Sequence, residues 1–513
     1  MDGQEEVIRF LEDGASFGKP GVKVARIETH ISIVFLVDNR VYKLKRAVRF
    51  SYLDYSTVAL REACCRKELA LNRRTAPELY LGVHAITRDA DGRLAVDGNG
   101  SAIDWIVAMR RFSDDALFDT LAKEGKLTLS LISELADRIA AFHEAEMPVH
   151  GQGGSAAMRD TIAGNRDNLL RHCPPLDGAS AEALDAASLA SLTRLGPLLD
   201  QRQGEGKVRR CHGDLHLRNV CLFEGRPTLF DCIEFNDTLA CIDVLYDLAF
   251  LLMDLVHRGL AAHANLACNR YLDMTGDIGG LAALPLFMSV RAAVRAHVLA
   301  SQDQGRDPGP SAAEARSYLA LARAMLQEHR PVLIAVGGLS GTGKSSLARA
   351  LASSIPPAPG ARMIRSDVLR KRLAHVAPET RLPPDAYGAA ASEQVYRAIT
   401  EQAAAALAAG YSAIADATYL RAEERNAIAE VARRAGVPFH GLWLEASQQL
   451  LEQRIDARRH DASDADRSVL AFQKNLDTGR IDWHRVDTNG DIGDVCRRAR
   501  EAIGSTNESD SGR

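Results

Sequence analysis

Short apolar runs separated by polar turns dominate the first 110 residues, and they predict strands gathered around one helix. Residues 34–37 and 41–45 have the composition of two strands joined by a tight polar turn. A polar helix is predicted over residues 56–74, and residues 102–109 return to strand character. This alternation predicts a small β-rich lobe at about residues 1–110.

From about residue 111 the pattern becomes mostly helical. Helices are expected over residues 128–146, 241–257 and 312–328. The last of these follows a polar loop but is expected to pack on the same domain. Residues 1–329 are therefore predicted to form one domain, with the β-rich lobe first and a helical lobe at about residues 111–329.

At Pro331 the pattern changes, because short all-apolar strands now alternate with alanine-rich helices. Strands are expected at residues 332–336, 363–364, 413–415 and 440–444. A helix over residues 390–409 would end at Gly410. Such alternation predicts a parallel, doubly wound sheet in a domain of residues 330–503. The polar residues 504–513 are predicted to be a disordered tail.

Composition narrows the class of protein. The chain has 513 residues, of which 46% are hydrophobic and 25% charged, and its net charge is -4. These values are typical of soluble globular domains and give no overall attraction to nucleic acid. The N-terminus has no apolar signal segment, and we expect no membrane span. Nine cysteines without a CxxC pair indicate reduced thiols and a cytoplasmic protein.

The most specific motif is a phosphate-binding loop at the start of the second domain. The segment from Gly338 to Ser345 fits GxxxxGK[ST] between a predicted strand and a predicted helix. Lys344 is expected to reach the β- and γ-phosphates of ATP, and the Ser345 hydroxyl to bind Mg²⁺. The residues expected to bind the nucleotide are Gly338, Ser340, Gly341, Thr342, Gly343, Lys344 and Ser345.

Two carboxylates follow predicted strands of this domain. Asp416 stands at the carboxyl end of a buried strand, where such sheets bind ligands, and it is a candidate to hold Mg²⁺. Asp367 closes an earlier strand and is a candidate to accept a proton from an acceptor hydroxyl. The alternative for each is a helix cap, which needs the same residue type.

A second catalytic pattern lies in the first domain. The spacing of His212, Asp214 and Asn219 matches HxDxxxxN, and Asp231 ends an apolar run twelve residues after Asn219. Phosphoryl transfer uses one carboxylate at the acceptor hydroxyl, with an Asn and a second carboxylate on Mg²⁺. Asp214 is therefore the candidate base, and Asn219 and Asp231 are the candidate metal ligands.

The segment HGDLHLRN closely resembles the aminoglycoside phosphotransferase and choline-kinase-like superfamily, and the wider similarity covers about residues 25–325. The resemblance implies an α+β protein-kinase-like fold. It also implies a nucleotide-binding lysine, Lys43 or Lys45, paired with Glu68. Both lysines share one face of the predicted strand, so the alternation does not choose between them. No G-x-G-x-x-G precedes them, and residues 29–32 occupy that place.

Residues 331–490 resemble small P-loop kinases of the AAA type, including the gluconate kinase and zeta-toxin-like groups. The resemblance implies that Arg454 and Arg458 neutralise the transferring phosphoryl group and that Arg425 helps to bind the acceptor. The alternative is that these arginines belong to a solvated charged face. Together the two resemblances indicate a bifunctional protein, with a phosphotransferase-like domain followed by an α/β P-loop domain.

The function expected from these patterns is an ATP- and Mg²⁺-dependent kinase of a small hydroxylated acceptor. One rival hypothesis is a regulatory protein that senses nucleotide without transferring phosphate. Another is a polynucleotide 5′-kinase, although no basic segment rich in aromatic residues marks a nucleic-acid partner. Because acceptor pockets vary on a shared scaffold, the resemblance does not name the acceptor.

Overall fold

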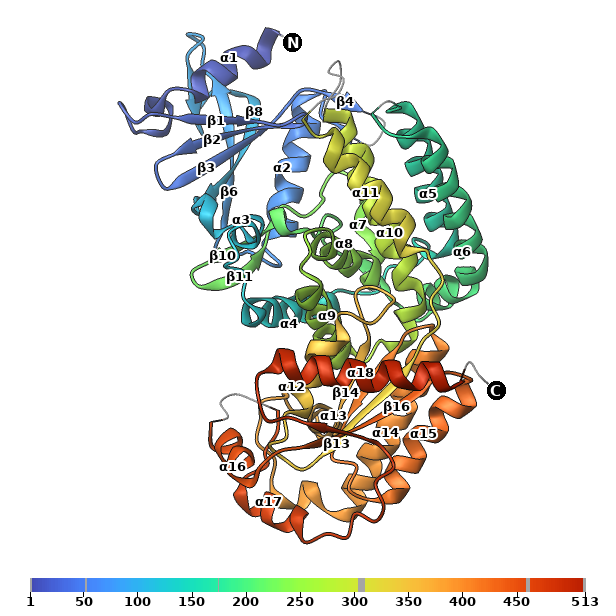
Figure 1. Ribbon diagram of the computed structural model, residues 1–513. Helices are drawn as coiled ribbons and strands as arrows, with labels where there is room; N and C mark the ends of the chain where they lie inside the picture. Colours follow the sequence, from blue (N-terminus) through green and yellow to red (C-terminus); the bar gives the residue numbers. More distant parts are fainter. Residues whose placement is uncertain (1, 51–52, 174, 303–309, 458–461, 511–513) are drawn as a thin grey trace. The chain divides into compact units, whose positions relative to one another are not determined.

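The computed structural model describes residues 2–50, 53–173, 175–302, 310–457 and 462–510 (Figure 1). The chain divides into two compact units. The first consists of Met1–Ala157 and Leu199–Leu251, and the second of Met158–Leu198 and Leu252–Arg513. The domain boundary predicted between residues 329 and 330 stays a prediction.

A six-stranded antiparallel sheet forms the first part of the first unit, in the order β1-β2-β3-β8-β6-β7. Its strands are β1 (Ala25–Glu28), β2 (Ser32–Val37), β3 (Arg40–Lys45), β6 (Tyr80–Arg88), β7 (Leu94–Val96) and β8 (Ser101–Arg110). Helix α2 (Val58–Asn72) contacts β6 and β8. Helix α1 (Asp2–Leu11), which the sequence analysis missed, buries Val7 and Leu11 in the core of the sheet.

The rest of the first unit is built from short strands and helices that carry the loops of interest. Its elements are β4 (Arg49–Phe50), β5 (Leu53–Asp54), α3 (Phe118–Lys123), α4 (Leu129–Ala145), β9 (Val208–Arg210), β10 (Val220–Phe223), β11 (Arg226–Leu229), α7 (Asp237–Ala240), β12 (Cys241–Asp243) and most of α8 (Val244–His257). Hairpin β10–β11 lies between Asn219 and Asp231, so its register fixes the spacing of these two side chains.

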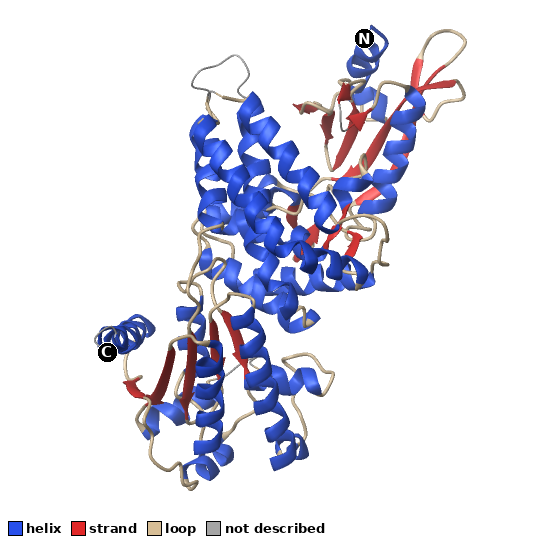
Figure 2. Ribbon diagram, turned by 90° about the vertical axis from the view of Figure 1, so that its right-hand side faces the viewer, coloured by secondary structure: helices blue, strands red, loops and turns tan. Residues whose placement is uncertain are grey.

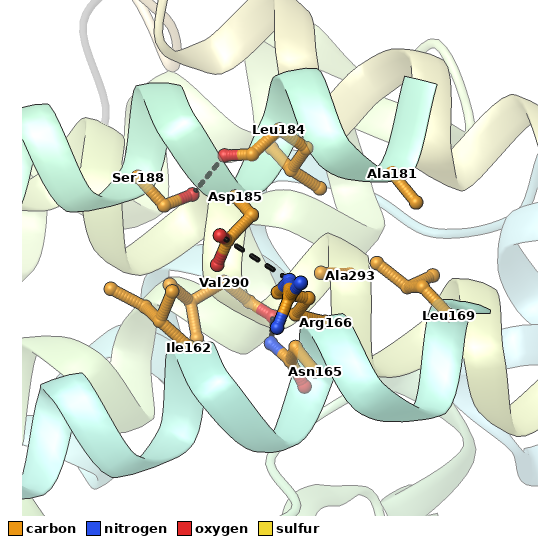
Figure 3. Close-up of a pocket in the computed structure, with 10 residues that line it drawn as sticks. All are labelled: Ile162, Asn165, Arg166, Leu169, Ala181, Leu184, Asp185, Ser188, Val290 and Ala293. Carbon is orange, nitrogen blue, oxygen red and sulfur yellow. Dashed lines mark hydrogen bonds and ion pairs between the residues drawn. The ribbon is translucent and has the colours of Figure 1, made fainter. Parts of the chain in front are cut away.

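Long helices make up the early part of the second unit. They are α5 (Gly154–Arg171), α6 (Gly178–Gly204), α9 (Ala261–Thr275), α10 (Leu284–Gln302) and α11 (Ala312–Met325). A small pocket lies between α5, α6 and α10 (Figure 3). Its lining is mostly aliphatic, and Arg166 and Asp185 form an ion pair of 3.6 Å across it. On the α10 side, the Asn165 amide donates to the Val290 carbonyl at 3.1 Å.

One described helical segment, Ile278–Gln302, is long and apolar enough to cross a membrane by length and composition. The expectation that the sequence has no such segment is therefore wrong on this criterion. The physical reason for the apolar composition is packing, since 72% of the apolar window is buried inside the molecule.

A five-stranded parallel sheet forms the rest of the second unit, in the order β14-β15-β13-β16-β17. The strands are β13 (Leu333–Gly338), β14 (Arg362–Arg365), β15 (Ala413–Asp416), β16 (Phe439–Glu445) and β17 (His484–Asp487). The helices are α12 (Lys344–Ala352), α13 (Ser366–Leu373), α14 (Ala389–Ala408), α15 (Ala422–Ala435), α16 (Gln448–Asp456), α17 (Arg467–Lys474) and α18 (Ile492–Asp510). Figure 2 shows these strands between helices. The predicted parallel sheet is confirmed.

The end of the chain differs from the expectation. Helix α18 includes residues 504–510, which the composition predicted to be disordered. Val495, Cys496 and Ala499 of this helix are buried against the parallel sheet and fix its first turns. Because each added residue of a nucleated helix gains a hydrogen bond at little further cost, a polar extension can continue the helix.

Helix α9 covers the free edge of strand β14. Asn269 accepts from the Met363 amide at 2.8 Å and donates to the Ala361 carbonyl at 3.2 Å, and Asn265 donates to the same carbonyl at 3.0 Å. Buried Arg362 donates to the Asn269 side chain at 3.0 Å and to Asp273 at 2.6 Å. These bonds satisfy edge groups of the sheet that a neighbouring strand would otherwise pair.

Two candidate phosphoryl-transfer sites

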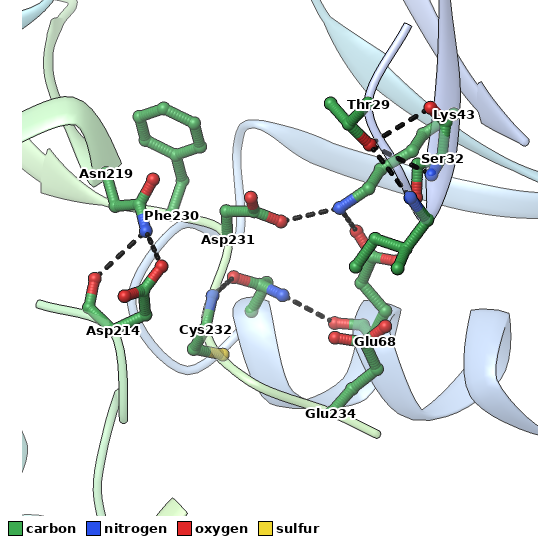
Figure 4. Close-up of polar contacts among 12 residues, drawn as sticks. Thr29, Ser32, Lys43, Glu68, Asp214, Asn219, Phe230, Asp231, Cys232 and Glu234 are labelled. Carbon is green, nitrogen blue, oxygen red and sulfur yellow. Dashed lines mark hydrogen bonds and ion pairs between the residues drawn. The ribbon is translucent and has the colours of Figure 1, made fainter. Parts of the chain in front are cut away.

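The first site is formed by the loop after β9 and by the two ends of hairpin β10–β11 (Figure 4). The Asn219 amide nitrogen donates to the Asp214 carbonyl and to its carboxylate, both at 2.9 Å. Asp231 adopts a left-handed backbone conformation with a φ of 62°. Its amide donates to the Tyr80 hydroxyl at 3.1 Å, which helps to hold this uncommon conformation.

The carboxylate of Asp247, in helix α8, binds the backbone of the loop that carries Asp214. Its carboxylate accepts from the amides of His212 at 3.1 Å and Gly213 at 2.8 Å, and it lies 3.1 Å from His143 Nε2. His212 Nε2 lies 2.9 Å from the Phe230 carbonyl, so the same loop is tied to the end of β11. Burial lowers the pKa of His212, although Asp247 opposes the shift. His212 thus connects this loop to the end of β11.

Two lysines of β3 point to the same group of carboxylates. Lys43 Nζ lies 3.0 Å from Glu68 and 2.6 Å from Asp231. Lys45 Nζ lies 2.6 Å from the other oxygen of Glu68, and it also contacts Glu234. Burial disfavours the charge on Lys43, but Asp231 and Glu68 outweigh it and raise its pKa well above the usual value. The structure therefore distinguishes the lysines by partner, since Lys43 contacts Asp231 and Lys45 contacts Glu234.

The turn between β1 and β2, with the first residue of β2, spans residues 29–32, which stand where a G-x-G-x-x-G would precede the lysines. The Thr29 hydroxyl accepts from the amide of Ser32 at 2.9 Å and donates to the Ser32 carbonyl at 3.0 Å (Figure 4). Arg46 donates to the Thr29 carbonyl at 3.1 Å. Hydrogen bonds of the Thr29 hydroxyl thus form this turn without the glycines of a G-x-G-x-x-G loop.

The second site lies at the carboxyl end of β13, where the order of the parallel strands reverses. The loop has positive φ values at Gly338 (133°), Gly341 (88°) and Gly343 (88°), which L-residues with a Cβ rarely adopt. A Cβ at Gly338 would lie 2.6 Å from the Leu444 carbonyl oxygen, and one at Gly341 would lie 2.7 Å from that of Leu451. The glycines are therefore required by both conformation and space.

Lys344 and Ser345 begin helix α12 beside this loop. Lys344 Nζ donates to the carbonyls of Gly338 and Leu339, both at 2.9 Å. The Ser345 hydroxyl donates to Asp416 at 2.5 Å, so the two oxygen ligands predicted for Mg²⁺ are adjacent. Such a hydroxyl and carboxylate pair has the donor chemistry that Mg²⁺ prefers.

Other side chains hold the loop in shape. Gln473 of α17 accepts from the Ser340 amide at 2.9 Å, and the Thr342 hydroxyl donates to the Leu339 carbonyl at 2.8 Å. Arg454 of α16 donates to the Thr342 carbonyl at 3.4 Å and to the Thr488 carbonyl at 2.9 Å. The guanidinium of Arg454 therefore braces the loop backbone.

Asp367 lies in the first turn of α13, close to the second site. The N-cap position of that helix belongs to Arg365, so Asp367 does not serve as the N-cap residue. Burial raises its pKa; Arg365 opposes this and the nearby charge of Asp416 adds to it. A carboxyl with a raised pKa beside a nucleotide loop has the properties of a general base.

Comparison with known proteins matches two separate parts of the chain to family models. Residues 69–284 match the model of the phosphotransferase enzyme family, and residues 333–476 match a model described as an AAA domain. The chain is also 30% identical over 480 residues to uncharacterized protein Rv2004c of Mycobacterium tuberculosis, a match that spans 90% of this chain and 92% of the relative. An uncharacterized protein of Mycobacterium bovis matches with the same values. The chain belongs to this family of paired phosphotransferase and P-loop proteins.

The two family matches make the chain an ATP-dependent phosphotransferase with a kinase-like domain and a P-loop kinase domain. Among solved structures, a gluconokinase from Sinorhizobium meliloti 1021 is 21% identical, with a TM-score of 0.27, and covers 36% of this chain and 100% of its own. A choline/ethanolamine kinase family protein from Mesorhizobium loti is 13% identical, with a TM-score of 0.37, and covers 63% of this chain and 95% of its own.

Three arginines of the P-loop domain had been assigned to the acceptor or the phosphoryl group. Arg425 is buried, and its guanidinium donates to the carbonyls of Tyr419, Leu420, Thr478 and Arg480 at 2.7–3.1 Å. The expectation that Arg425 helps to bind the acceptor is corrected, because the side chain is buried and both of its terminal nitrogens donate to backbone carbonyls. Arg458 lies outside the described residues. The role of Arg454 in neutralising the transferring phosphoryl group stays a prediction.

The sequence analysis missed several residues of the phosphotransferase site. Glu234 and Asp247 are 4% and 0% exposed, yet neither is among the site residues predicted from the sequence. A carboxylate predicted to be buried needs a partner, and that requirement is the signal that would have identified Asp247. Among the described residues, His143, Cys211 and Asp247 lie close enough together to hold a metal. Asp247, however, already accepts from two loop amides.

Proposed function

We propose that the protein is a cytoplasmic, ATP- and Mg²⁺-dependent kinase of a small hydroxylated acceptor, with one catalytic site in each domain. The observation that supports the proposal is that each site brings together a lysine, a carboxylate and a further amide or hydroxyl group, through Lys43–Asp231 and Asn219–Asp214 in one and Lys344 and Ser345–Asp416 in the other. A domain kept only to bind nucleotide has no need for an acceptor-side carboxylate such as Asp214 or Asp367.

In the phosphotransferase domain, Lys43 would bind the phosphates of ATP after leaving Asp231. The amide nitrogen of Asn219 donates to Asp214. The Oδ1 of Asn219 and the carboxylate of Asp231 would bind the metal. Mg²⁺ held there would neutralise charge on the transferring phosphoryl group. Asp214 would orient the acceptor hydroxyl and take its proton, and Asp247 would keep the loop amides in place.

In the P-loop domain, Lys344 would exchange the carbonyls of Gly338 and Leu339 for phosphate oxygens. Ser345 and Asp416 would hold the metal, since their oxygens already meet. Asp367, with its raised pKa, would accept the proton of the acceptor hydroxyl. Arg454 would stabilise the loop through its hydrogen bond to the Thr342 carbonyl.

Turnover by the full chain tests the proposal. We would incubate it with ATP and a panel of sugars, aminoglycosides and nucleosides, with Mg²⁺ or with EDTA. The expected result is transfer of the γ-phosphate to at least one small acceptor, only with Mg²⁺. A protein that binds ATP and Mg²⁺ but transfers phosphate to none of these classes would support the regulatory, nucleotide-sensing alternative instead.

A further inference from the structure

The phosphotransferase site contains a second buried lysine that the proposed transfer does not use. The Lys45 side chain is 1% exposed, and its Nζ lies 2.6 Å from Glu68 and 3.3 Å from the Tyr55 hydroxyl, in contact with Glu234. Tyr55 in turn donates to Glu234 at 2.6 Å. Burying two carboxylates and a lysine costs free energy unless each is paired, so this cluster is stable only as a whole.

The cluster joins chain segments that carry the catalytic groups. Glu68 comes from α2 and divides its two oxygens between Lys43 and Lys45. Glu234 comes from the loop after β11, three residues beyond Asp231. Lys45 therefore links helix α2, which carries Glu68, to the loop that carries the proposed metal ligand Asp231.

The charge balance around Glu68 would change when ATP binds as proposed. Lys43 now balances Glu68 and Asp231, but it would turn to the phosphates of ATP. Glu68, whose side chain is 0% exposed, would then keep only Lys45 as its cationic partner. Lys45 is fixed by Glu234 as well, so it can hold Glu68 in place while Lys43 moves.

We propose that Lys45 and Glu234 form a positioning pair, which holds Glu68 and the Asp231 loop in the geometry that binds Mg²⁺ and ATP. The proposal rests on the proposed function of the phosphotransferase site. It divides the work of the two lysines, because Lys43 would contact the nucleotide and Lys45 would act only through Glu68 and Glu234.

The test is calorimetric titration of the full chain with ATP, with and without Mg²⁺. All proteins carry Lys344→Ala so that the P-loop site is silent. This parent protein is expected to bind one ATP, more tightly with Mg²⁺. No binding by the folded parent would refute the proposed function of the site itself, which separates that failure from failure of the positioning pair.

Three further variants test the pair. Lys43→Met should weaken ATP binding with and without Mg²⁺. Lys45→Met should mainly reduce the gain that Mg²⁺ gives, by about 10- to 100-fold, the usual effect of removing a group that orients a metal ligand. Adding Glu234→Gln to Lys45→Met should cause little further loss, because the pair is already broken.

An unchanged Mg²⁺ gain in a folded Lys45→Met protein, even with a lower melting temperature, would show a merely structural role and overturn the proposal. The same holds if adding Glu234→Gln to Lys45→Met causes a further loss as large as that of Lys45→Met itself. If circular dichroism shows that the Lys45→Met protein is unfolded, the single variant Glu234→Gln decides the test of the pair. It leaves Lys45 paired with Glu68 and should lower the Mg²⁺ gain, whereas an unchanged gain would again contradict the pair.

Discussion

At the scale of single residues, two carboxylates of the phosphotransferase site have different partners and therefore different proposed tasks. Asp214 accepts from Asn219 and is the proposed carboxylate for the acceptor hydroxyl, while Asp231 pairs with Lys43. Loss of charge at the first should damage transfer, and loss at the second should also damage metal binding. The two substitutions thus separate a working kinase site from one that only binds nucleotide.

We expect Asp214→Asn to abolish transfer by the phosphotransferase domain and to leave ATP affinity nearly unchanged. Loss of a general base alone slows a reaction by ~10²–10⁴-fold. Asp231→Asn should weaken Mg²⁺·ATP binding as well, because it removes a metal ligand. Calorimetry and turnover of both variants check this. Full turnover by Asp214→Asn, with normal Mg²⁺·ATP binding by Asp231→Asn, would show that this loop is not catalytic.

Asp367 links activity to stability through its raised pKa. A carboxyl whose pKa is higher in the folded than in the unfolded chain favours folding when protonated, and this contribution is lost as pH rises through the folded pKa. Asp367→Asn removes the cost of burying the charge. The variant should therefore lose P-loop transfer but melt at a higher temperature than the parent at pH 8. The difference should shrink toward pH 4, and an equal or lower melting temperature at pH 8 would count against the assignment.

At the scale of elements, α9 belongs to the span that matches the phosphotransferase family, yet it pairs with the edge strand of the P-loop sheet. The same helix contacts α12 and α13, which carry Lys344 and Asp367. Strand β14 ends next to Asp367, so the edge contacts of α9 help to set the position of that carboxylate. A chain cut at residue 330 would lose these contacts and expose the β14 edge.

Asn269→Ala should destabilise the second unit by about 1–3 kcal/mol, because the Met363 amide and the Arg362 guanidinium lose a buried acceptor. Hydrogen exchange at the Met363 amide should become faster. The control is Asn168→Ala, which removes an exposed bond within helix α5. Equal melting temperatures and equal exchange in the two variants would show that α9 does not support the strand.

The elements that the sequence predicts best are those whose signal is local. Strand alternation placed β2, β3 and β8, and the glycine pattern placed the loop before Lys344. The choice between Lys43 and Lys45 was beyond local pattern, because it depends on Asp231 and Glu234, almost 190 residues away. The pairing of α9 with β14 is hidden for the same reason, since its asparagines are ordinary polar helix residues by sequence.

At the scale of the whole molecule, each unit contains one proposed nucleotide site, and the two proposed sites use separate residues. Lys344→Ala should therefore remove ATP binding at the P-loop domain and leave binding at the phosphotransferase domain. Titration of the full chain checks this, with a stoichiometry expected to fall from two to one. Two sites of unchanged affinity in the variant would contradict the role of the loop lysine.

The central claim is that the protein transfers phosphate to small hydroxylated molecules. Mass spectrometry of a small-molecule cell extract, incubated with the full chain and ATP, tests it most directly. The account predicts that at least one metabolite becomes heavier by one phosphoryl group, and that the product disappears when Asp214→Asn and Asp367→Asn are combined. No phosphorylated product with the parent protein, or the same product with the folded double variant, would contradict the account.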